Sequence, residues 1–293
     1  MHAADRQKPV FRFAPSPNGF LHLGHALSAL INQEMAGRFE GRLLLRIEDI
    51  DQTRCRPEFV HEIFRDLAWL GLEWEEPVRH QSNHIGEYQA ALAKLEALSL
   101  LYPAFLTRGE VKARVAASEA AGRPWPRDPD GAPIYPPDDR NRSPAERAQL
   151  LAGGLRHAIR LDMRKALALI GEPLTWRETG DGAAGIITAD PGAWGDVILS
   201  RSDAPSSYHL SVVVDDAAQG VTHVVRGLDL FHATAVHRLL QVLLGLPEPD
   251  YHHHRLVPGP DGRKLSKSEG STGLAALRAA GVSPAEIREM LGF

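Results

Sequence analysis

The feature that most constrains this sequence is the order of patterns within residues 10–50. VFRFA reads as a short buried strand, and PSPNG after it is dense in turn-forming residues. Apolar positions then recur with helical spacing within 22–39 and predict one buried helix face: Leu23, Ala26, Leu27, Leu30 and Ile31. GRLLLRIEDID has the continuous apolar centre typical of a strand in a parallel sheet. Strand, loop, helix and strand predict a βαβ unit with a right-handed crossover, and hence an α/β fold of the Rossmann type.

The rest of the chain continues this alternation with one interruption. Helical stretches are predicted at 57–70 and 84–98, and Thr107 with Glu110 forms a capping box for a further helix. The segment 124–141 is too rich in proline for regular structure. Ser143, Pro144 and Glu146 predict the start of another helix. HAIRLDM and DVILSR are expected to be strands that lead back towards the first unit.

The last third of the sequence is expected to complete the parallel sheet. YHLSVVVDD and THVVRG are read as strands, with a helix after Leu228 and a capped helix at SPAEIREML. We therefore predict a catalytic domain in two halves, 1–103 and 196–250. An inserted basic α/β domain spans 104–195, and a loop with a short helical tail spans 251–293.

Composition excludes several protein classes. The 293 residues are 43% hydrophobic, which is ample for a core, yet no apolar run reaches the roughly 18 residues of a membrane helix. The N-terminal segment lacks the apolar centre of a secretory signal. Cys55 is the only cysteine, so neither disulfides nor a cysteine-rich zinc site can form within one chain. We expect a cytoplasmic monomer with no membrane association.

The charge distribution indicates a possible nucleic-acid contact. The net charge of -4 argues against a protein that coats nucleic acid indiscriminately. Residues 107–165 nevertheless hold 12 Lys/Arg against 8 Asp/Glu, so the predicted insert is locally basic. A solvated surface with a chance excess of cations explains this patch equally well when it is taken alone.

Two short motifs carry chemistry suited to a nucleotide. HLGH at 22–25 lies at the first turn of a predicted helix, where unpaired backbone N–H groups and the helix dipole favour phosphate. His22 and His25 could donate hydrogen bonds to phosphate oxygens, and Gly24 lets a nucleotide ring approach the backbone. KLSKS at 264–268 places Lys264, Ser266 and Lys267 on a loop that could clamp a triphosphate.

Together these motifs resemble the two signatures of class I aminoacyl-tRNA synthetases. The segments FRFAPSPNGFLHLGHA, LLLRIEDIDQTR, SYHLSVVVDDAAQGVTHVVRGLDL and KLSKS resemble the glutamyl branch of that family, from about Phe11 to Ser268. The resemblance implies an inserted domain of the acceptor-binding type, and ATP with Mg²⁺ as the nucleotide substrate. It implies that His22, His25, Lys264 and Lys267 act in catalysis, and that Gly24 and Ser266 join them in binding ATP. It also implies a ligase that activates glutamate as an adenylate.

The resemblance extends to an amino-acid pocket. Glutamate brings two carboxylates and an ammonium group, so its pocket needs cations and one anion. Arg12 and Arg226, expected at strand ends, can supply the cations, and Glu48 can hold the ammonium. The positions that line the glutamate site in the family match Arg12, Ala14, Ser16, Glu48, Tyr208 and Arg226.

The sequence departs from the family in ways that change the expected acceptor. Only 25 residues follow KLSKS, where full-length members continue into an anticodon-binding region. This shortened form resembles a paralogous branch that attaches glutamate to queuosine, the modified wobble base of tRNA(Asp). The implied partner is therefore the anticodon stem-loop of tRNA(Asp), facing the basic insert and the first motif.

Two further departures concern the insert and a helix. Many of these paralogues bind zinc through three cysteines and a tyrosine, where this chain has Ala104, Leu106, Tyr135 and Asp139. Because three thiolates are missing, we predict that zinc is absent. ATAVHR at 233–238 replaces a Thr-Pro-Arg-Gln stretch with unknown effect. Three consecutive histidines, at 252–254, could suggest a metal site. Adjacent side chains in an extended segment point to opposite faces, so at most one pair of them could converge on a metal.

Three other functions stay open at this point. The chain could be a minimal glutamyl-tRNA(Glu) synthetase that charges a 3′-terminal adenosine. It could be a small-molecule nucleotidyltransferase, since those enzymes also pair an HxGH-type motif with a lysine- or serine-rich loop. It could also be a regulatory paralogue that binds glutamate or ATP without catalysis, although its intact motifs argue against this.

Overall fold

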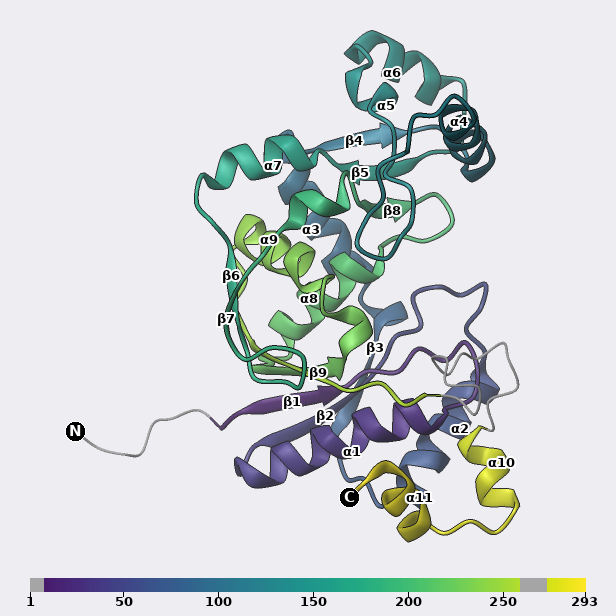
Figure 1. Ribbon diagram of the computed structural model, residues 1–293, viewed down its shortest axis with the longest axis vertical. Coiled ribbons are helices and arrows are strands. Elements are labelled where there is room, and N and C mark those ends of the chain that lie inside the picture. The colour runs from purple at the N-terminus through teal and green to yellow at the C-terminus, as the bar shows by residue number, and fades with distance from the viewer. Residues whose placement is uncertain (1–7, 259–272) are drawn as a thin grey trace, which may run out of the picture.

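The computed structural model describes residues 8–258 and 273–293, and it arranges them as an elongated molecule in which the insert lies at one end (Figure 1). Within these residues the strands form a parallel β1-β2-β3 sheet, a four-stranded β7-β6-β10-β9 sheet and an antiparallel β4-β5-β8 sheet. The motif loop KLSKS, with Lys264, Ser266 and Lys267, lies outside the described residues.

The first unit is the predicted βαβ fold. Its elements are β1 (Val10–Phe13), α1 (Leu23–Arg38), β2 (Arg42–Ile47), α2 (Pro57–Trp69), β3 (Glu75–His80), η1 (Gln81–Asn83) and α3 (Ile85–Ala97). β1 pairs parallel with β2, and β2 pairs parallel with β3. The helix face predicted from spacing is confirmed. Ala26, Leu27 and Leu30 are buried in one apolar cluster, and half-buried Leu23 and Ile31 pack against it.

The second half of the sheet returns late in the chain. Its elements are β6 (Thr175–Glu178), β7 (Gly185–Thr188), η2 (Pro191–Trp194), α8 (Tyr208–Ala218), β9 (His223–Gly227), η3 (Leu228–Leu230), α9 (Thr234–Leu244) and β10 (Asp250–His254). β9 pairs parallel with β10. The Thr222 N–H donates to the Val10 carbonyl at 3.0 Å, which places the start of β9 beside β1. β6 and β7 pair antiparallel, whereas β10 pairs parallel with both β6 and β9. Residues at the carboxyl ends of β1, β2, β9 and β10 line one cavity, so these ends lie at the same edge.

The insert contains the antiparallel sheet and short helices. Its elements are β4 (Leu101–Ala104), α4 (Arg108–Ala120), α5 (Asp138–Asn141), α6 (Pro144–Ala152), β5 (Ala158–Leu161), α7 (Met163–Ile170) and β8 (Ile198–Arg201). The Thr107 and Ser143 caps form as predicted, each with a reciprocal glutamate. β6 and β7 fall within the range assigned to the insert, yet β6 pairs with β10 of the catalytic sheet. The domain limits themselves stay a prediction.

The C-terminal tail folds back on the first unit. α10 (Leu274–Ala279) and α11 (Pro284–Leu291) place Leu274, Ile287 and Leu291 in the same apolar cluster as Leu27 and Leu30 of α1. Ser283 caps α11 as the sequence predicts. No helix in the described part of the chain is both long and apolar enough to span a bilayer.

One predicted strand is wrong. YHLSVVVDD forms the helix α8, whose N-cap Ser207 accepts the N–H of Leu210. Its residues are buried on several sides, so the apolar run carries no helical period and resembles that of a central strand. A smaller difference is α5, a single helical turn inside the proline-rich segment that was expected to be irregular.

Candidate active site

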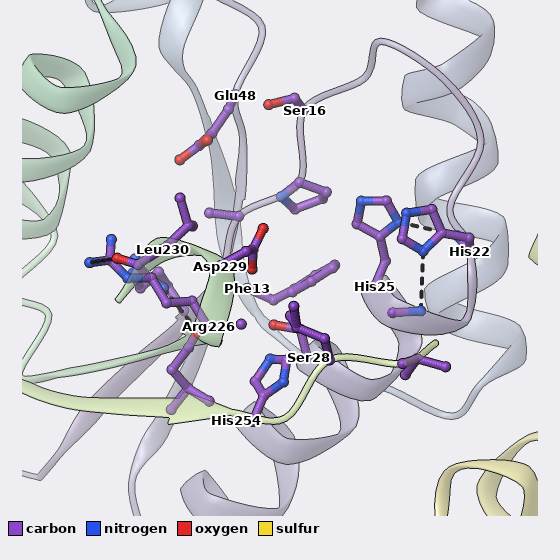
Figure 2. Close-up of a pocket in the computed structure, with 18 of the residues that line it drawn as sticks. Phe13, Ser16, His22, His25, Ser28, Glu48, Arg226, Asp229, Leu230 and His254 are labelled. Carbon is purple, nitrogen blue, oxygen red and sulfur yellow. Dashed lines mark hydrogen bonds between the residues drawn. The ribbon is translucent and has the colours of Figure 1, made fainter. Parts of the chain in front are cut away.

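A cavity of about 580 Å³ lies where the carboxyl ends of β1, β2 and β9 meet the start of α1. Figure 2 shows its walls, with Ser16 and Glu48 on one side, His22 and His25 on another, and Arg226 with His254 on a third. Nine residues predicted from the sequence line this one cavity: Arg12, Ala14, Ser16, His22, Gly24, His25, Glu48, Tyr208 and Arg226. Their roles in binding and catalysis stay predictions.

The two histidines cap the N-terminus of α1, which lies at the cavity. His22 is the N-cap of α1, and its Nδ1 accepts the Gly24 N–H at 3.1 Å. His25 Nδ1 accepts the N–H of His22, also at 3.1 Å, and the two ring centroids lie 3.9 Å apart. In a neutral imidazole whose Nδ1 accepts, the proton is on Nε2. Capping thus fixes the tautomer and makes the outer nitrogen of each ring a hydrogen-bond donor.

Gly24 packs closely against His22. A Cβ built on it would lie 3.0 Å from Cε1 and 3.2 Å from Nδ1 of His22. A side chain at this position would therefore crowd the His22 ring, which would have to shift by a few tenths of an ångström. The sequence predicted a small residue here for nucleotide access, and the structure adds a steric reason within the protein.

Arg12 forms an ion pair within the protein. It lies within β1 and is buried, with Nε 3.0 Å from Asp216 Oδ1 and Nη2 3.4 Å from Asp216 Oδ2. Arg46, which is fully buried, donates from Nη1 to the same Asp216 carboxylate at 2.7 Å. Burial disfavours the ionised Asp216, but Arg12 and Arg46 outweigh it and lower the pKa of this carboxyl.

Sequence reasoning missed Arg46, Asp215 and Asp216 as parts of the site's foundation. Asp215 accepts hydrogen bonds from Arg79, Gln81 and Tyr88, so α8 is joined to β3 and α3. The available signal was the pair of aspartates that ends an apolar run, because buried carboxylates are rare unless they are paired. Because this segment was predicted to be a strand, the two aspartates were not recognised as a buried pair.

Glu48 is a buried anion at the end of β2. Its side chain contacts Arg46 Nη2 at 3.2 Å, and it is 8% exposed. Burial raises the pKa of Glu48 more than Arg46 and Arg12 lower it. The carboxylate is therefore poorly compensated and suited to receive a cationic group of a ligand.

Arg226 is a buried cation in the same cavity. Its guanidinium contacts only neutral groups, and it forms no ion pair among residues 8–258 and 273–293. It is 5% exposed, and Tyr208 Oη lies 3.4 Å from its Nη1. A buried cation without a counter-ion is costly, which makes Arg226 the strongest anion-binding candidate in the cavity.

The cavity continues towards the insert. A second cavity of about 500 Å³ shares Ser16, Asn18, Glu48 and Tyr208 with the first. A third, of about 880 Å³ beneath α4, shares Tyr135, Arg160 and Arg201 with the second. The shared lining residues place the three cavities side by side, in a row from the carboxyl edge of the sheet to the basic insert. We call this row the groove.

The insert end of the groove is cationic. Arg108, Lys112 and Arg156 line it and make no ion pair within the described ranges. Arg160 lies with its guanidinium carbon 3.8 Å from the centre of the Tyr135 ring. The rim is therefore suited to polyanions, and an aromatic ring forms part of the wall.

The four positions that match the family's zinc ligands do come together. Tyr135 donates its hydroxyl to Asp139 at 2.5 Å, and the N–H groups of Phe105 and Leu106 donate to the same carboxylate at 2.7 and 3.3 Å. Arg142 binds its other oxygen at 2.7 Å. One carboxylate and one phenol, with Ala104 and Leu106, do not make a tetrahedral zinc site. Hydrogen bonds join the loop ends here, and the absence of zinc stays a prediction.

The histidine run follows the alternation of a strand. Within β10, His253 is fully buried and its Nδ1 contacts Glu178 at 2.6 Å, whereas His252 contacts Thr179 on another side. His254 donates from Nδ1 to the Arg255 carbonyl at 2.8 Å. Among the residues that the structure describes, no three His, Cys, Asp or Glu side chains gather as metal ligands.

This geometry has close counterparts in known proteins. The family model "tRNA synthetases class I (E and Q), catalytic domain" matches residues 9–292. A glutamyl-Q tRNA(Asp) synthetase of Rhodobacter capsulatus is 43% identical over 97% of this chain and 100% of its own length. Another protein of that name, from Symbiobacterium thermophilum, is 41% identical over 96% of this chain and 85% of its own.

A solved structure agrees with these sequence relatives. The glutamate tRNA ligase of Elizabethkingia meningosepticum, determined in complex with its amino acid, superimposes with a TM-score of 0.73 at 27% identity. The match covers 90% of this chain and 53% of that one. The fold is that of a class I aminoacyl-tRNA synthetase catalytic domain. More narrowly, the chain belongs to the glutamate and glutamine family of these synthetases.

Proposed function

We propose that this protein activates glutamate with ATP and transfers the glutamyl group to queuosine in the anticodon loop of tRNA(Asp). ATP use follows from the class I catalytic domain. The observation that carries the choice of glutamate is the pairing within one cavity of uncompensated Arg226 with poorly compensated Glu48. The names of two full-length relatives support the acceptor.

Amino-acid binding follows from the charges of the cavity. Arg226 receives the side-chain carboxylate, because it is the buried cation there that lacks a counter-ion within the described ranges. Glu48 receives the ammonium group, which stabilises its ionised form. Ser16 and Tyr208 line the space between them, and Arg12, held by Asp216, contributes positive potential near the reacting carboxylate.

Activation requires no protein nucleophile. A carboxylate oxygen of glutamate attacks the α-phosphorus of the Mg²⁺ complex of ATP, the P–O bond to pyrophosphate breaks, and glutamyl-adenylate forms. His22 and His25 present Nε2–H donors at the N-terminus of α1, where the helix dipole also favours phosphate. Lys264, Ser266 and Lys267 are proposed to bind the departing pyrophosphate, on the strength of the motif alone.

The acceptor is proposed to enter along the groove. A hydroxyl of the modified base attacks the carbonyl carbon of the adenylate, and AMP leaves. The continuity of the groove with the cationic rim at Arg108, Lys112 and Arg156 supports an approach of the anticodon stem-loop from the insert side. We expect one monomer to bind one tRNA.

The first experiment is transfer of labelled glutamate to purified tRNA(Asp) with and without queuosine, alongside tRNA(Glu). Labelling confined to queuosine-containing tRNA(Asp) supports the proposal. Labelling of tRNA(Glu) would instead identify a minimal glutamyl-tRNA(Glu) synthetase, which the likeness to a glutamate tRNA ligase structure makes the second candidate. ATP–pyrophosphate exchange without labelling of any tRNA would contradict the acceptor and leave glutamate activation intact.

The pocket assignment has its own test. Arg226→Ala should abolish measurable glutamate binding by calorimetry while the Kd for ATP, measured in the same way, stays within about twofold. Arg177→Ala, on the exposed side of β6 and outside the cavity, is the matched control. Retained glutamate affinity in Arg226→Ala would overturn the assignment.

A further inference from the structure

The hydrogen bonds of Arg226 divide into a rear set and a front set. At the rear, Nε donates to His253 Nε2 at 3.0 Å, Nη1 to His237 Nδ1 at 3.0 Å and Nη2 to Thr234 Oγ1 at 2.7 Å. At the front, Tyr208 Oη and the Leu230 carbonyl accept at 3.4 and 3.3 Å. The two front acceptors line the cavity, and the three rear ones do not. The weak bonds are therefore those that a ligand can replace.

Glu178 fixes the tautomer of His253, on the side of the ring that faces away from Arg226. Its Nδ1–H donates to Glu178 Oε2 at 2.6 Å, so Nε2 keeps a lone pair for Arg226. Glu178 is itself held by N–H donors from Trp176, Thr179, Gly180 and the backbone of His253. Burial lowers the pKa of His253 to about 4 although Glu178 opposes the shift. The ring is neutral at physiological pH.

His237 is the matching acceptor on the other side. It lies in the ATAVHR segment, within the first turns of α9, and is 1% exposed. Its Nδ1 accepts from Arg226, so Nε2 carries the proton and donates to His209 Nδ1 at 3.1 Å. Burial, together with the nearby Arg226, lowers the pKa of His237 well below its ordinary value. His237 thus places a neutral acceptor behind Arg226.

We propose that His237 and His253 are positioning residues that select an anionic substrate side chain. They orient the guanidinium as neutral acceptors, so Arg226 keeps its full charge for a carboxylate at the front. A carboxylate in either rear position would satisfy the geometry equally well but neutralise the cation. Glutamine has a neutral side chain of the same shape as glutamate, so a neutralised Arg226 would discriminate less strongly against glutamine. This inference rests on the proposed glutamate site.

The test compares two substitutions of the same shape. His237→Gln supplies a neutral carbonyl oxygen to Arg226, whereas His237→Glu supplies a carboxylate. Dissociation constants for glutamate and glutamine are measured by calorimetry on the full chain, with the KM for ATP as reference. In His237→Gln the dissociation constant for glutamate should stay within about threefold of the wild-type value. In His237→Glu it should rise about tenfold or more, and the ratio of the affinities for glutamate and glutamine should become smaller.

The outcomes separate this inference from the proposed function. Equal effects of the His237→Gln and His237→Glu substitutions would overturn the inference, because a merely structural role of His237 depends on the shape of the side chain and not on its charge. A wild-type chain that binds no glutamate would refute the proposed function instead. If His237→Glu does not fold, His237→Leu replaces it, since Leu removes the acceptor altogether. Glutamate should then bind about tenfold more weakly than in His237→Gln, with an unchanged KM for ATP, and equal affinity of the two would contradict the inference.

Discussion

Arg12 Nε lies 3.0 Å from Asp216 Oδ1, and both side chains are buried, so the first strand of the sheet is joined to a helix 204 positions later. The same carboxylate binds Arg46. Two cations thus share one anion beneath the cavity floor. Removal of that anion would leave Arg12 buried without a counter-ion among the described residues, and Arg46 would keep only Glu48 and Asp215 as partners.

Asp216→Asn should therefore lower the free energy of unfolding by about 3 kcal/mol or more in urea titrations. The control is Glu75→Gln, which breaks the exposed Arg42–Glu75 pair at 2.6 Å and should cost less than about 1 kcal/mol. Equal losses in the two variants would show that the buried network does not support the fold as argued.

Glu48→Gln keeps the size of the side chain and removes its charge. Because the ammonium group of glutamate loses a charge-assisted bond, the KM for glutamate in ATP–pyrophosphate exchange should rise about 10- to 100-fold. Glu58→Gln, on the exposed start of α2, should have no effect. An unchanged KM in Glu48→Gln would place the ammonium group elsewhere.

His22→Asn separates capping from catalysis. Asparagine caps helices well but is too short to present a donor where His22 Nε2 lies, so kcat should fall about 100-fold while stability is kept. His22→Ala should lose the same activity and a further ~1 kcal/mol of stability. Full activity in His22→Asn would mean that His22 serves α1 only as its cap.

Acid should destabilise the protein through its buried histidines. Burial lowers the pKa of His209 and of His253 from the ordinary value of 6.5 to about 4. Between pH 6.5 and about 4 the unfolded chain takes up protons that the native state cannot, so the free energy of unfolding falls as the pH falls. His209→Asn should flatten this slope by up to about 1.4 kcal/mol per pH unit. The exposed His232→Asn is the control, and an identical slope in His209→Asn and wild type would refute the argument.

Metal analysis of purified protein should find less than stoichiometric zinc. Asp139→Ala should destabilise the insert by roughly 2 kcal/mol, because it removes the acceptor of the Phe105 N–H and of the Tyr135 hydroxyl. Its exposed neighbour offers the control Asp138→Ala, which removes only the surface pair with Arg114. Zinc at one equivalent per chain would contradict the prediction.

The sequence by itself determined the features that depend on neighbouring residues. The βαβ unit follows from local periodicity, and the caps at Thr107, Ser143 and Ser283 follow from reciprocal bonds three residues apart. The nine predicted residues that line the cavity were found from their motifs and from the resemblance of their segments to a known family.

Only the tertiary structure decided what depends on contacts between distant parts of the chain. Whether 208–216 is helix or strand could not be read from a segment buried on several sides, since full burial removes the period that distinguishes them. The partners of Arg12 and Arg226 were equally hidden. Asp216 forms an ion pair with Arg12, whereas Arg226 is held by the neutral side chains of His237 and His253. Two arginines that look alike in the sequence thus differ because charge compensation is set by the groups that folding brings beside them.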